Sequence, residues 1–290
     1  MSKLALGTVQ FGLEYGVANE SGQINFSEAK NILKLAKEKN IDLIDTAIAY
    51  GNSEKVIGKI GIEGFKYISK LPALPENCKD IDYWIKDMVE ASLKRLRIEN
   101  LYGLLLHQPK DLLGASGEKL INSLYKIKSS GLVKKIGISI YDPSEIEQVI
   151  NLLKIEIVQA PLSIIDRRLE TSGWLFRLHQ QKIEVHTRST FLQGLLLMSK
   201  NEIPSKFSQW EFFFDRWFLE LKKKNLSPVQ ACLSYPMSLT QVDRVVIGVD
   251  NLFQFKNLIE ASKIKSLNHD LSFMISNDEL LINPRNWGFL

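Results

Sequence analysis

Short apolar runs alternate with longer amphipathic segments along the whole chain, and this order constrains the fold more than any other feature. The segment that begins near Ser27 is typical of a helix, because apolar residues repeat at helical spacing from Ala29 to Ala36. The runs predicted as strands are residues 3–8, 41–45, 66–70, 101–107, 134–139, 155–160, 183–189 and 244–249. For three of the segments predicted as helices only the start is predicted, near residues 27, 53 and 142. The others are predicted to span residues 81–96, 118–129, 169–181, 209–238 and 253–262.

Eight strand-to-helix steps without an interrupting linker predict a single α/β domain, a closed (β/α)8 TIM barrel with a parallel sheet. An open doubly wound sheet is the main alternative. It is disfavoured because no Gly-x-Gly-x-x-Gly follows the first strand. We expect residues 1–264 to form the barrel and residues 265–290 to form a C-terminal tail.

The composition limits the classes of function. The net charge of +4 is small, and the basic run Lys222–Lys224 is typical of a solvated helix end, so nucleic acid is not an expected partner. Cys78 and Cys232 have neither metal-ligand spacing nor a disulfide framework. No signal peptide and no apolar run of membrane-spanning length is recognised. We expect a cytoplasmic protein without a metal or a membrane partner.

Four polar residues fall at or just past the carboxyl ends of predicted strands, where TIM barrels carry their chemistry. They are Asp45, Tyr50, Lys70 and His107. Each has a structural explanation when taken alone, because an aspartate can cap a turn, a lysine can extend to water and a histidine can be bonded in a core. Their combination at one rim favours a functional interpretation.

A lysine at the end of a buried strand needs a counter-charge, which Asp45 on the neighbouring strand can supply. The charge of Lys70 is expected to lower the pKa of Tyr50 from about 10 and to make it a general acid near neutral pH. His107 is expected to hydrogen-bond the same oxygen. This combination suits a carbonyl group that accepts a hydride and needs a proton on its oxygen.

The motifs "DTAIAYGNSE", "SKLP" and "LLLHQP" resemble those of the aldo-keto reductases, which are (β/α)8 barrels that bind a nicotinamide without a Rossmann fold. The resemblance runs from "LALGTVQFG" to "RVVIGVDNLFQF". It implies that Tyr50 is the acid, that Lys70 and Asp45 tune it, and that His107 orients a small carbonyl substrate. It also implies a C-terminal tail that closes over the substrate mouth, with Trp287 as a candidate lining residue.

The resemblance also assigns residues to the dinucleotide. Ser139 and Gln159 match residues that bind the nicotinamide carboxamide, whereas Ile140 replaces the usual asparagine after the serine. Arg188 replaces an aromatic residue that stacks on the nicotinamide, and it can lie against that ring or pair with an acid at the rim. The segment "TRSTFLQGLLL" places three residues along the pyrophosphate: Ser189, Leu192 and Gln193.

The segment after the eighth predicted strand bears on the choice between NADPH and NADH. The family usually binds NADP and holds its 2′-phosphate with basic and hydroxyl residues at this point. Gly248, Asp250 and Gln254 stand there instead, and Asp250 would repel a phosphate. Lys256 and Arg244 are near enough in sequence to supply a positive charge for the 2′-phosphate. We expect NADPH to be preferred only modestly and NADH to be usable.

Other interpretations stay open. Some members of the family are redox-sensing subunits that bind the dinucleotide with little turnover. A Schiff-base enzyme acting through Lys70 would need a lowered lysine pKa, which Asp45 opposes. A short-chain reductase is disfavoured, because no Tyr-x-x-x-Lys occurs. The segments "GTVQFGLEYGV" and "RSTFLQGLL" resemble members associated with surface-sugar biosynthesis, which favours a sugar-like carbonyl. The oligomeric state is not predicted.

Overall fold

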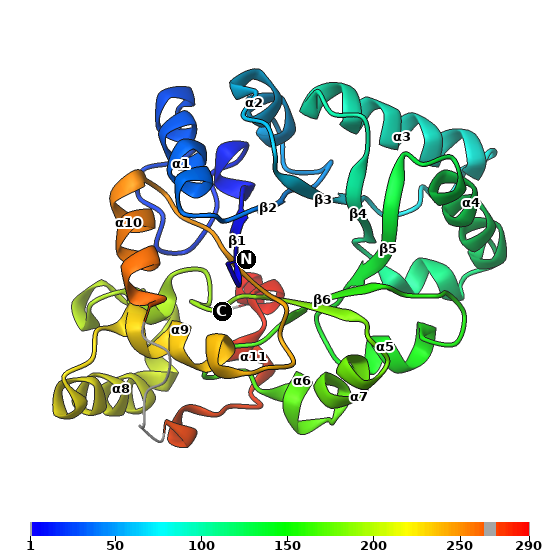
Figure 1. Ribbon diagram of the computed structural model, residues 1–290. Helices are drawn as coiled ribbons and strands as arrows, with labels where there is room; N and C mark the ends of the chain where they lie inside the picture. Colours follow the sequence, from blue (N-terminus) through cyan, green and yellow to red (C-terminus); the bar gives the residue numbers. More distant parts are fainter. Residues whose placement is uncertain (1, 264–270, 290) are drawn as a thin grey trace.

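The computed structural model describes residues 2–263 and 271–289, and its centre is a closed barrel of eight parallel strands (Figure 1). The strands follow one another around the barrel in chain order, and β8 pairs with β1 through Val245 and Leu4. They are β1 (Leu4–Gly7), β2 (Leu43–Asp45), β3 (Lys66–Leu71), β4 (Leu101–Leu106), β5 (Val133–Ser139), β6 (Ile157–Pro161), β7 (Glu184–Arg188) and β8 (Arg244–Ile247). The predicted TIM barrel is confirmed.

Helices surround the barrel (Figure 1). They are α1 (Phe26–Glu38), α2 (Ser53–Ile60), α3 (Ile81–Leu96), α4 (Gly117–Ser129), α5 (Ser144–Val149), α6 (Arg168–Thr171), α7 (Trp174–Gln180), α8 (Glu211–Lys224), α9 (Pro228–Ser238), α10 (Leu252–Ala261) and α11 (Glu279–Ile282). Within the described ranges, none of them combines the length and apolar character that a membrane span requires. The predicted boundary between barrel and tail, at residue 264, lies outside the described residues.

Two of the predicted helical segments are each divided in two. Segment 169–181 is interrupted at Gly173, whose φ of 79° is left-handed, so α6 and α7 are separate. In segment 209–238, α8 ends at Lys224 and is capped by Asn225, whose φ is 51°, and α9 begins after Ser227 with Pro228 in its first turn. Left-handed residues end helices, and proline lacks the N–H that would continue one.

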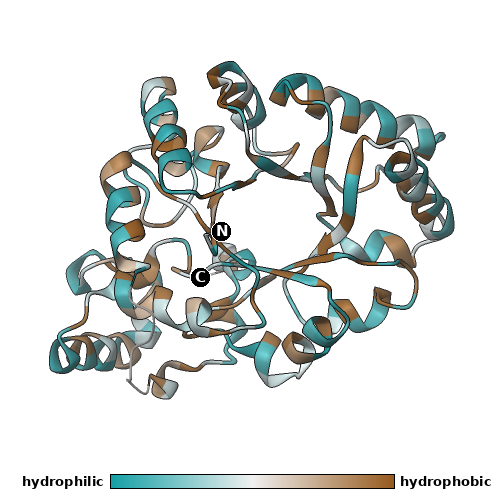
Figure 2. Cartoon of the chain, viewed as in Figure 1, coloured by the Kyte–Doolittle hydropathy of each residue, from teal (hydrophilic) through white to brown (hydrophobic). Residues whose placement is uncertain are grey.

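The apolar side chains form an inner and an outer layer. Inside the barrel, Ala5, Leu43, Ile68, Leu105 and Ile157 form one cluster, and a larger core includes residues of the strands and helices. Figure 2 shows brown residues along the strands, whereas the surrounding helices carry both teal and brown residues. Because side chains fill the interior of the barrel, a ligand can bind only at the rim.

A buried carboxylate anchors the helix that follows the predicted acid. Glu54, in the first turn of α2, is 2% exposed. It accepts hydrogen bonds from Ser69 of β3 and Ser92 of α3, at 2.7 and 2.6 Å, and its other oxygen lies 2.7 Å from Arg95 Nη2. A buried charge with this many partners is fixed in place. The loop that carries Tyr50 therefore leads into a rigid helix start.

Candidate active site

The structure brings Asp45 and Lys70 together at the rim. Asp45 is the last residue of β2, and Lys70 is the next to last residue of β3. Lys70 Nζ donates to Asp45 Oδ2 at 2.7 Å and to the Thr46 carbonyl oxygen at 2.9 Å. The two side chains form a buried ion pair, since Lys70 is 1% exposed and Asp45 is 4% exposed.

Gln159 extends this polar network. Its Nε2 donates to Asp45 Oδ1 at 2.6 Å, so both oxygens of that carboxylate have a donor. Gln159 lies in β6 and pairs in register with Ser139, the last residue of β5. Ser139 is also buried. The two residues assigned to the nicotinamide carboxamide are therefore neighbours, next to the ion pair.

Tyr50 lies in the loop between β2 and α2. The loop is held by hydrogen bonds from Tyr50 N to the Ala47 carbonyl oxygen and from Ser53 N to the Tyr50 carbonyl oxygen. Lys70 Nζ lies 5.1 Å from the centre of the Tyr50 ring. Gly12 allows this placement, because a Cβ there would overlap the Tyr50 carbonyl oxygen.

The pKa of Tyr50 corrects the prediction. Burial raises the pKa of the phenol above its ordinary value of 10.0, and the charge of Lys70 opposes this rise only in part. Asp45 acts against Lys70 and contributes to the rise. The expected lowering is wrong because desolvation outweighs an ammonium group whose charge Asp45 already balances. Tyr50 therefore keeps its proton throughout the neutral range, as a proton donor must.

His107 follows β4 directly, and its ring lies edge-on to Tyr50 with 6.1 Å between the ring centres. Burial, followed by the charges of Lys70 and Arg188, lowers the pKa of His107 to about 4. The imidazole is therefore neutral at physiological pH, with one ring nitrogen as a donor. The structure thus gathers the four residues predicted at this rim.

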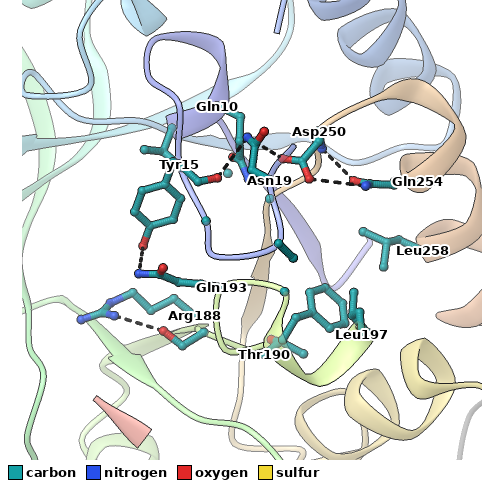
Figure 3. A pocket seen from close by; sticks show the side chains of 18 of the residues that line it. Gln10, Tyr15, Asn19, Arg188, Thr190, Gln193, Leu197, Asp250, Gln254 and Leu258 are labelled. Atoms are coloured by element: carbon teal, nitrogen blue, oxygen red, sulfur yellow. Dashed lines mark hydrogen bonds between the residues drawn. The ribbon is translucent and has the colours of Figure 1, made fainter. Parts of the chain in front are cut away.

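A cavity of about 480 Å³ is lined by Asp45 and Tyr50 and extends to Asp250 and Gln254. Figure 3 shows the part of this cavity near Asp250 and Gln254. The size of the cavity falls within the usual range for small-molecule sites, about 300–1,000 Å³. It is lined by residues from the segments 7–10, 15–20, 188–198 and 248–258. The cavity therefore follows the carboxyl ends of β7, β8 and β1.

The loop after β7 has an unusual backbone. Ser189, Leu192 and Gln193 have φ values of 62°, 50° and 54°, which non-glycine residues adopt at a cost of about 1–3 kcal/mol each. Ser189 and Gln193 line the cavity, and Gln193 Nε2 donates to Tyr15 Oη at 3.3 Å (Figure 3). Leu192 is 1% exposed, packs into the core and does not line the cavity. Its predicted contact therefore cannot involve its side chain.

Arg188 ends β7 and lines the inner part of the cavity. Its guanidinium donates to the Ile140 carbonyl oxygen at 2.7 Å and to Ser189 Oγ at 3.2 Å. It also lies 4.0 Å from the centre of the Tyr141 ring. Arg188 forms no ion pair with an acid among the described residues, so the structure does not show the predicted pairing with an acid at the rim.

The far end of the cavity is organised around Asp250. Its carboxylate accepts a hydrogen bond from Asn19 Nδ2 at 3.2 Å, and Gln254 Oε1 accepts from Asp250 N at 2.8 Å (Figure 3). Burial raises the pKa of Asp250. Gly248 lines the same end, where a Cβ would crowd the amide of Gln10. The three residues expected at this end of the dinucleotide therefore lie together.

Arg244 cannot supply the positive charge that sequence proximity suggested. It is the first residue of β8, at the end of the strand opposite to Asp250, and its guanidinium pairs with Asp42 at 2.9 Å. Lys256 lies on an exposed part of α10 and does not line the cavity. Among the described residues that line the Asp250 end, no lysine or arginine is present.

Two buried polar atoms of the cavity residues have no hydrogen-bond partner in the described structure. They are Gln10 Oε1 and Thr190 Oγ1. A buried polar atom without a partner is costly unless a ligand or water supplies one. A cavity that reaches from Tyr50 to Asp250 and contains such atoms fits a ligand with several polar groups, as a dinucleotide is.

Sequence reasoning did not identify Gln10, Tyr15, Asn19 or Thr190. The first three belong to the segment between β1 and α1, residues 8–25, which is long for such a connection. Long loops in compact domains are usually functional, so its length was the available signal. Thr190 lay inside a motif whose neighbours were recognised, and only the structure shows its buried hydroxyl facing the cavity.

The tail reaches the rim through a different residue from the one predicted. Trp287 is buried against Phe207, with 4.9 Å between the ring centres, and it does not line the cavity. Arg285, two residues earlier, lies with its guanidinium carbon 3.4 Å from the centre of the Tyr141 ring. Tyr141 comes two residues after the end of β5.

Comparison with known proteins identifies relatives over nearly the whole chain. The family described as "Aldo/keto reductase family" matches residues 3–272. The "Uncharacterized oxidoreductase YqkF" of Bacillus subtilis strain 168 is 25% identical, over 93% of this chain and 94% of that protein. The "NADH-specific methylglyoxal reductase" of Escherichia coli K12 is also 25% identical, over 74% and 72% of the two chains.

A solved structure has the same fold. The holo form of the aldo-keto reductase AKR11C1 from Bacillus halodurans superposes with a TM-score of 0.73 and covers 94% of this chain and 90% of its own. Its sequence is 22% identical, so this likeness concerns the barrel alone.

Proposed function

The chain belongs to the aldo/keto reductase family, and we propose that it reduces the carbonyl group of a ketone or aldehyde with Tyr50 as the proton donor. As a member of that family it is an NAD(P)-dependent oxidoreductase that acts on small carbonyl compounds. One observation carries the proposal: the buried Lys70–Asp45 ion pair lies beside Tyr50, with Lys70 Nζ 5.1 Å from the centre of the Tyr50 ring, and Asp45 and Tyr50 both line the cavity.

The chemistry follows from these contacts. A nicotinamide bound in the cavity would supply the hydride that reaches the carbonyl carbon, and would itself be oxidised. The electron pair of the carbonyl bond moves to oxygen, which takes the proton of Tyr50. Lys70 stabilises the tyrosinate that remains, and water at the cavity mouth restores its proton. Neutral His107 donates a hydrogen bond to the same carbonyl oxygen and holds it towards Tyr50.

We propose that the dinucleotide lies in the cavity with its nicotinamide near Tyr50 and its adenosine near Asp250. Gln159 uses its amide nitrogen on Asp45, so its amide oxygen and the Ser139 hydroxyl are left for the nicotinamide carboxamide. Ser189 and Gln193 lie midway, beside the pyrophosphate. The adenosine ribose lies at the end formed by Gly248, Asp250 and Gln254.

Asp250 is expected to weaken the preference for NADPH, because a carboxylate repels a 2′-phosphate but accepts hydrogen bonds from ribose hydroxyls. NADH should be usable, and Asp250→Arg should shift the preference towards NADPH through KM. The measurement is kcat/KM for both cofactors in wild type, in Asp250→Arg and in a control, Asp87→Arg, on an exposed part of α3. A wild-type preference for NADPH above roughly a thousandfold, about 4 kcal/mol, would contradict this expectation.

The substrate is proposed to be a small carbonyl compound of the sugar type. The name of the Escherichia coli relative refers to methylglyoxal and to NADH, which supports a small oxo compound and a usable NADH. A screen of sugar aldehydes, ketones and simple aldehydes, followed by the loss of reduced-nicotinamide absorbance, tests the proposal. If cofactor binds tightly and no carbonyl compound is reduced, a redox-sensing subunit becomes the better interpretation.

The Schiff-base alternative is disfavoured by the charge of Lys70. Burial lowers the pKa of the Lys70 ammonium group. Asp45 and Tyr50 together raise this pKa by more than burial lowers it, so it lies above the usual lysine value. A nucleophilic lysine needs the opposite shift.

A further inference from the structure

The ring of Tyr141 lies between two arginines beside the candidate active site. The guanidinium carbon of Arg188 is 4.0 Å from the ring centre, and that of Arg285 is 3.4 Å from it. A guanidinium group at either distance covers one whole face of the Tyr141 ring, so the two guanidinium groups stack on opposite faces. Arg188 comes from β7 and Arg285 from the 3-10 helix Pro284–Phe289 of the tail. Cation–π attraction offsets part of their mutual repulsion.

These cations lie close to the proposed reacting centre. Arg188 lines the same cavity as Tyr50. Burial, Lys70 and Arg188 lower the pKa of His107, and Arg285 adds to that effect. Asp45 acts in the opposite direction. The cations Lys70, Arg188 and Arg285 all lie near enough to act on the histidine, and one of them comes from the tail.

Neither guanidinium is neutralised by an acid in the part of the chain that the structure describes. Arg188 donates to Ile140 O and Ser189 Oγ, which are uncharged. A nearby arginine shows the contrast, because Arg168 forms ion pairs with three carboxylates, those of Asp142, Asp166 and Glu279. Two uncompensated guanidinium groups beside an active site attract a negative charge.

The tail is held so that Arg285 stays in place. Arg168 pairs with Glu279 of α11, and it also donates to the Tyr141 carbonyl oxygen at 3.2 Å. Ser276 N donates to the Ile165 carbonyl oxygen at 3.0 Å. One arginine thus connects the Tyr141 loop to the segment that carries Arg285.

We propose that Arg188 and Arg285, stacked on Tyr141, form a subsite for an anionic group on the carbonyl substrate, either a carboxylate or a phosphate. The planar donors of arginine match both groups in a two-bond geometry. The inference rests on the proposed reductase function and specifies its substrate class: a carbonyl compound whose carbonyl group faces Tyr50 while its anion contacts the arginines.

Two matched substrate pairs test the subsite. Succinic semialdehyde and butanal differ in a carboxylate, and glyceraldehyde 3-phosphate and glyceraldehyde differ in a phosphate. Wild type should prefer the charged member of at least one pair by roughly tenfold or more in kcat/KM, about 1.4 kcal/mol. Arg285→Gln should remove most of that preference through KM and leave the neutral member nearly unchanged. The pair that responds identifies the anion.

Arg177→Gln is the matched control. It removes one guanidinium that lies 5.1 Å from the ring centre of Trp174, on α7, and it should not alter either ratio. Arg285→Lys keeps the positive charge but lacks the planar guanidinium donors, so it should retain part of the preference for the charged substrate. If Arg285→Gln lowers both members of a pair equally, the residue only anchors the tail and the subsite is contradicted.

Direct binding separates failure of the subsite from failure of the reductase proposal. Calorimetry with succinate and with inorganic phosphate, on protein with and without NADPH, should show binding of one anion that Arg285→Gln weakens by roughly tenfold. Anion binding without any carbonyl reduction would keep the subsite and refute the proposed function. Reduction of neutral aldehydes without anion binding or a charge preference would refute the subsite alone.

Discussion

Replacement of Tyr50 by phenylalanine should lower kcat for carbonyl reduction by roughly 10²- to 10⁴-fold and leave dinucleotide affinity almost unchanged. The hydroxyl acts only when the carbonyl oxygen gains charge, so its loss removes an interaction of the transition state. The ring keeps its position, because backbone hydrogen bonds hold the Tyr50 loop. Turnover and the quenching of cofactor fluorescence, measured on the same samples, check the two parts of this prediction.

The matched control is Tyr83→Phe, which removes a hydroxyl from an exposed position on α3. It should leave turnover unaffected. The wild-type rate should stay level through the neutral range and fall only above the ordinary phenol pKa, since burial raises the pKa of Tyr50. A Tyr50→Phe enzyme that keeps most of the wild-type rate would refute the assignment of the acid.

Lys70→Met should abolish activity at neutral pH and reduce the free energy of unfolding. Without the ammonium group the tyrosinate loses its stabilisation, so the pKa of Tyr50 rises further and proton donation slows. Asp45 would keep its hydrogen bond from Gln159 but lose its counter-charge. Removing one partner of a buried ion pair typically costs about 3–5 kcal/mol. The measurements are a pH–rate profile and urea unfolding.

The control for Lys70→Met lies on the same strand. Lys66 begins β3 at the opposite end of the barrel and pairs with Asp42 at 3.2 Å. Lys66→Met should keep the wild-type pH–rate profile. If Lys70→Met folds and retains that profile as well, Lys70 does not tune Tyr50. A borohydride-trapped adduct on Lys70 with an aldehyde would instead favour the Schiff-base alternative.

The barrel could be predicted from the sequence because it depends on local patterns. Eight short apolar runs, each followed by helical spacing, leave few topologies, and strand ends place polar residues at one rim. Helix boundaries inside 169–181 and 209–238 were not resolved, although Gly173 and Ser227–Pro228 carry the signals. These signals are local, whereas the helical segments were delimited by apolar residues on either side of each interruption.

The electrostatics of the site depend on burial, which the sequence does not state. The ion pair followed from neighbouring strands, but the pKa of Tyr50 moves in the opposite direction to the prediction because desolvation is the larger effect. Arg244 is near Asp250 in sequence yet occupies the other end of β8. The stack of Tyr141 with Arg285 joins segments far apart in the chain, and no local motif marks it.

Transfer of deuterium tests the central claim most directly. NADPH or NADH that carries deuterium in both positions at the nicotinamide C4 is incubated with the protein and an aldehyde, and the alcohol is analysed by mass spectrometry. We expect one deuterium on the carbinol carbon of the product and almost none with Tyr50→Phe. Tight cofactor binding without labelled alcohol, or an alcohol whose carbinol hydrogen comes from water, would contradict the claim.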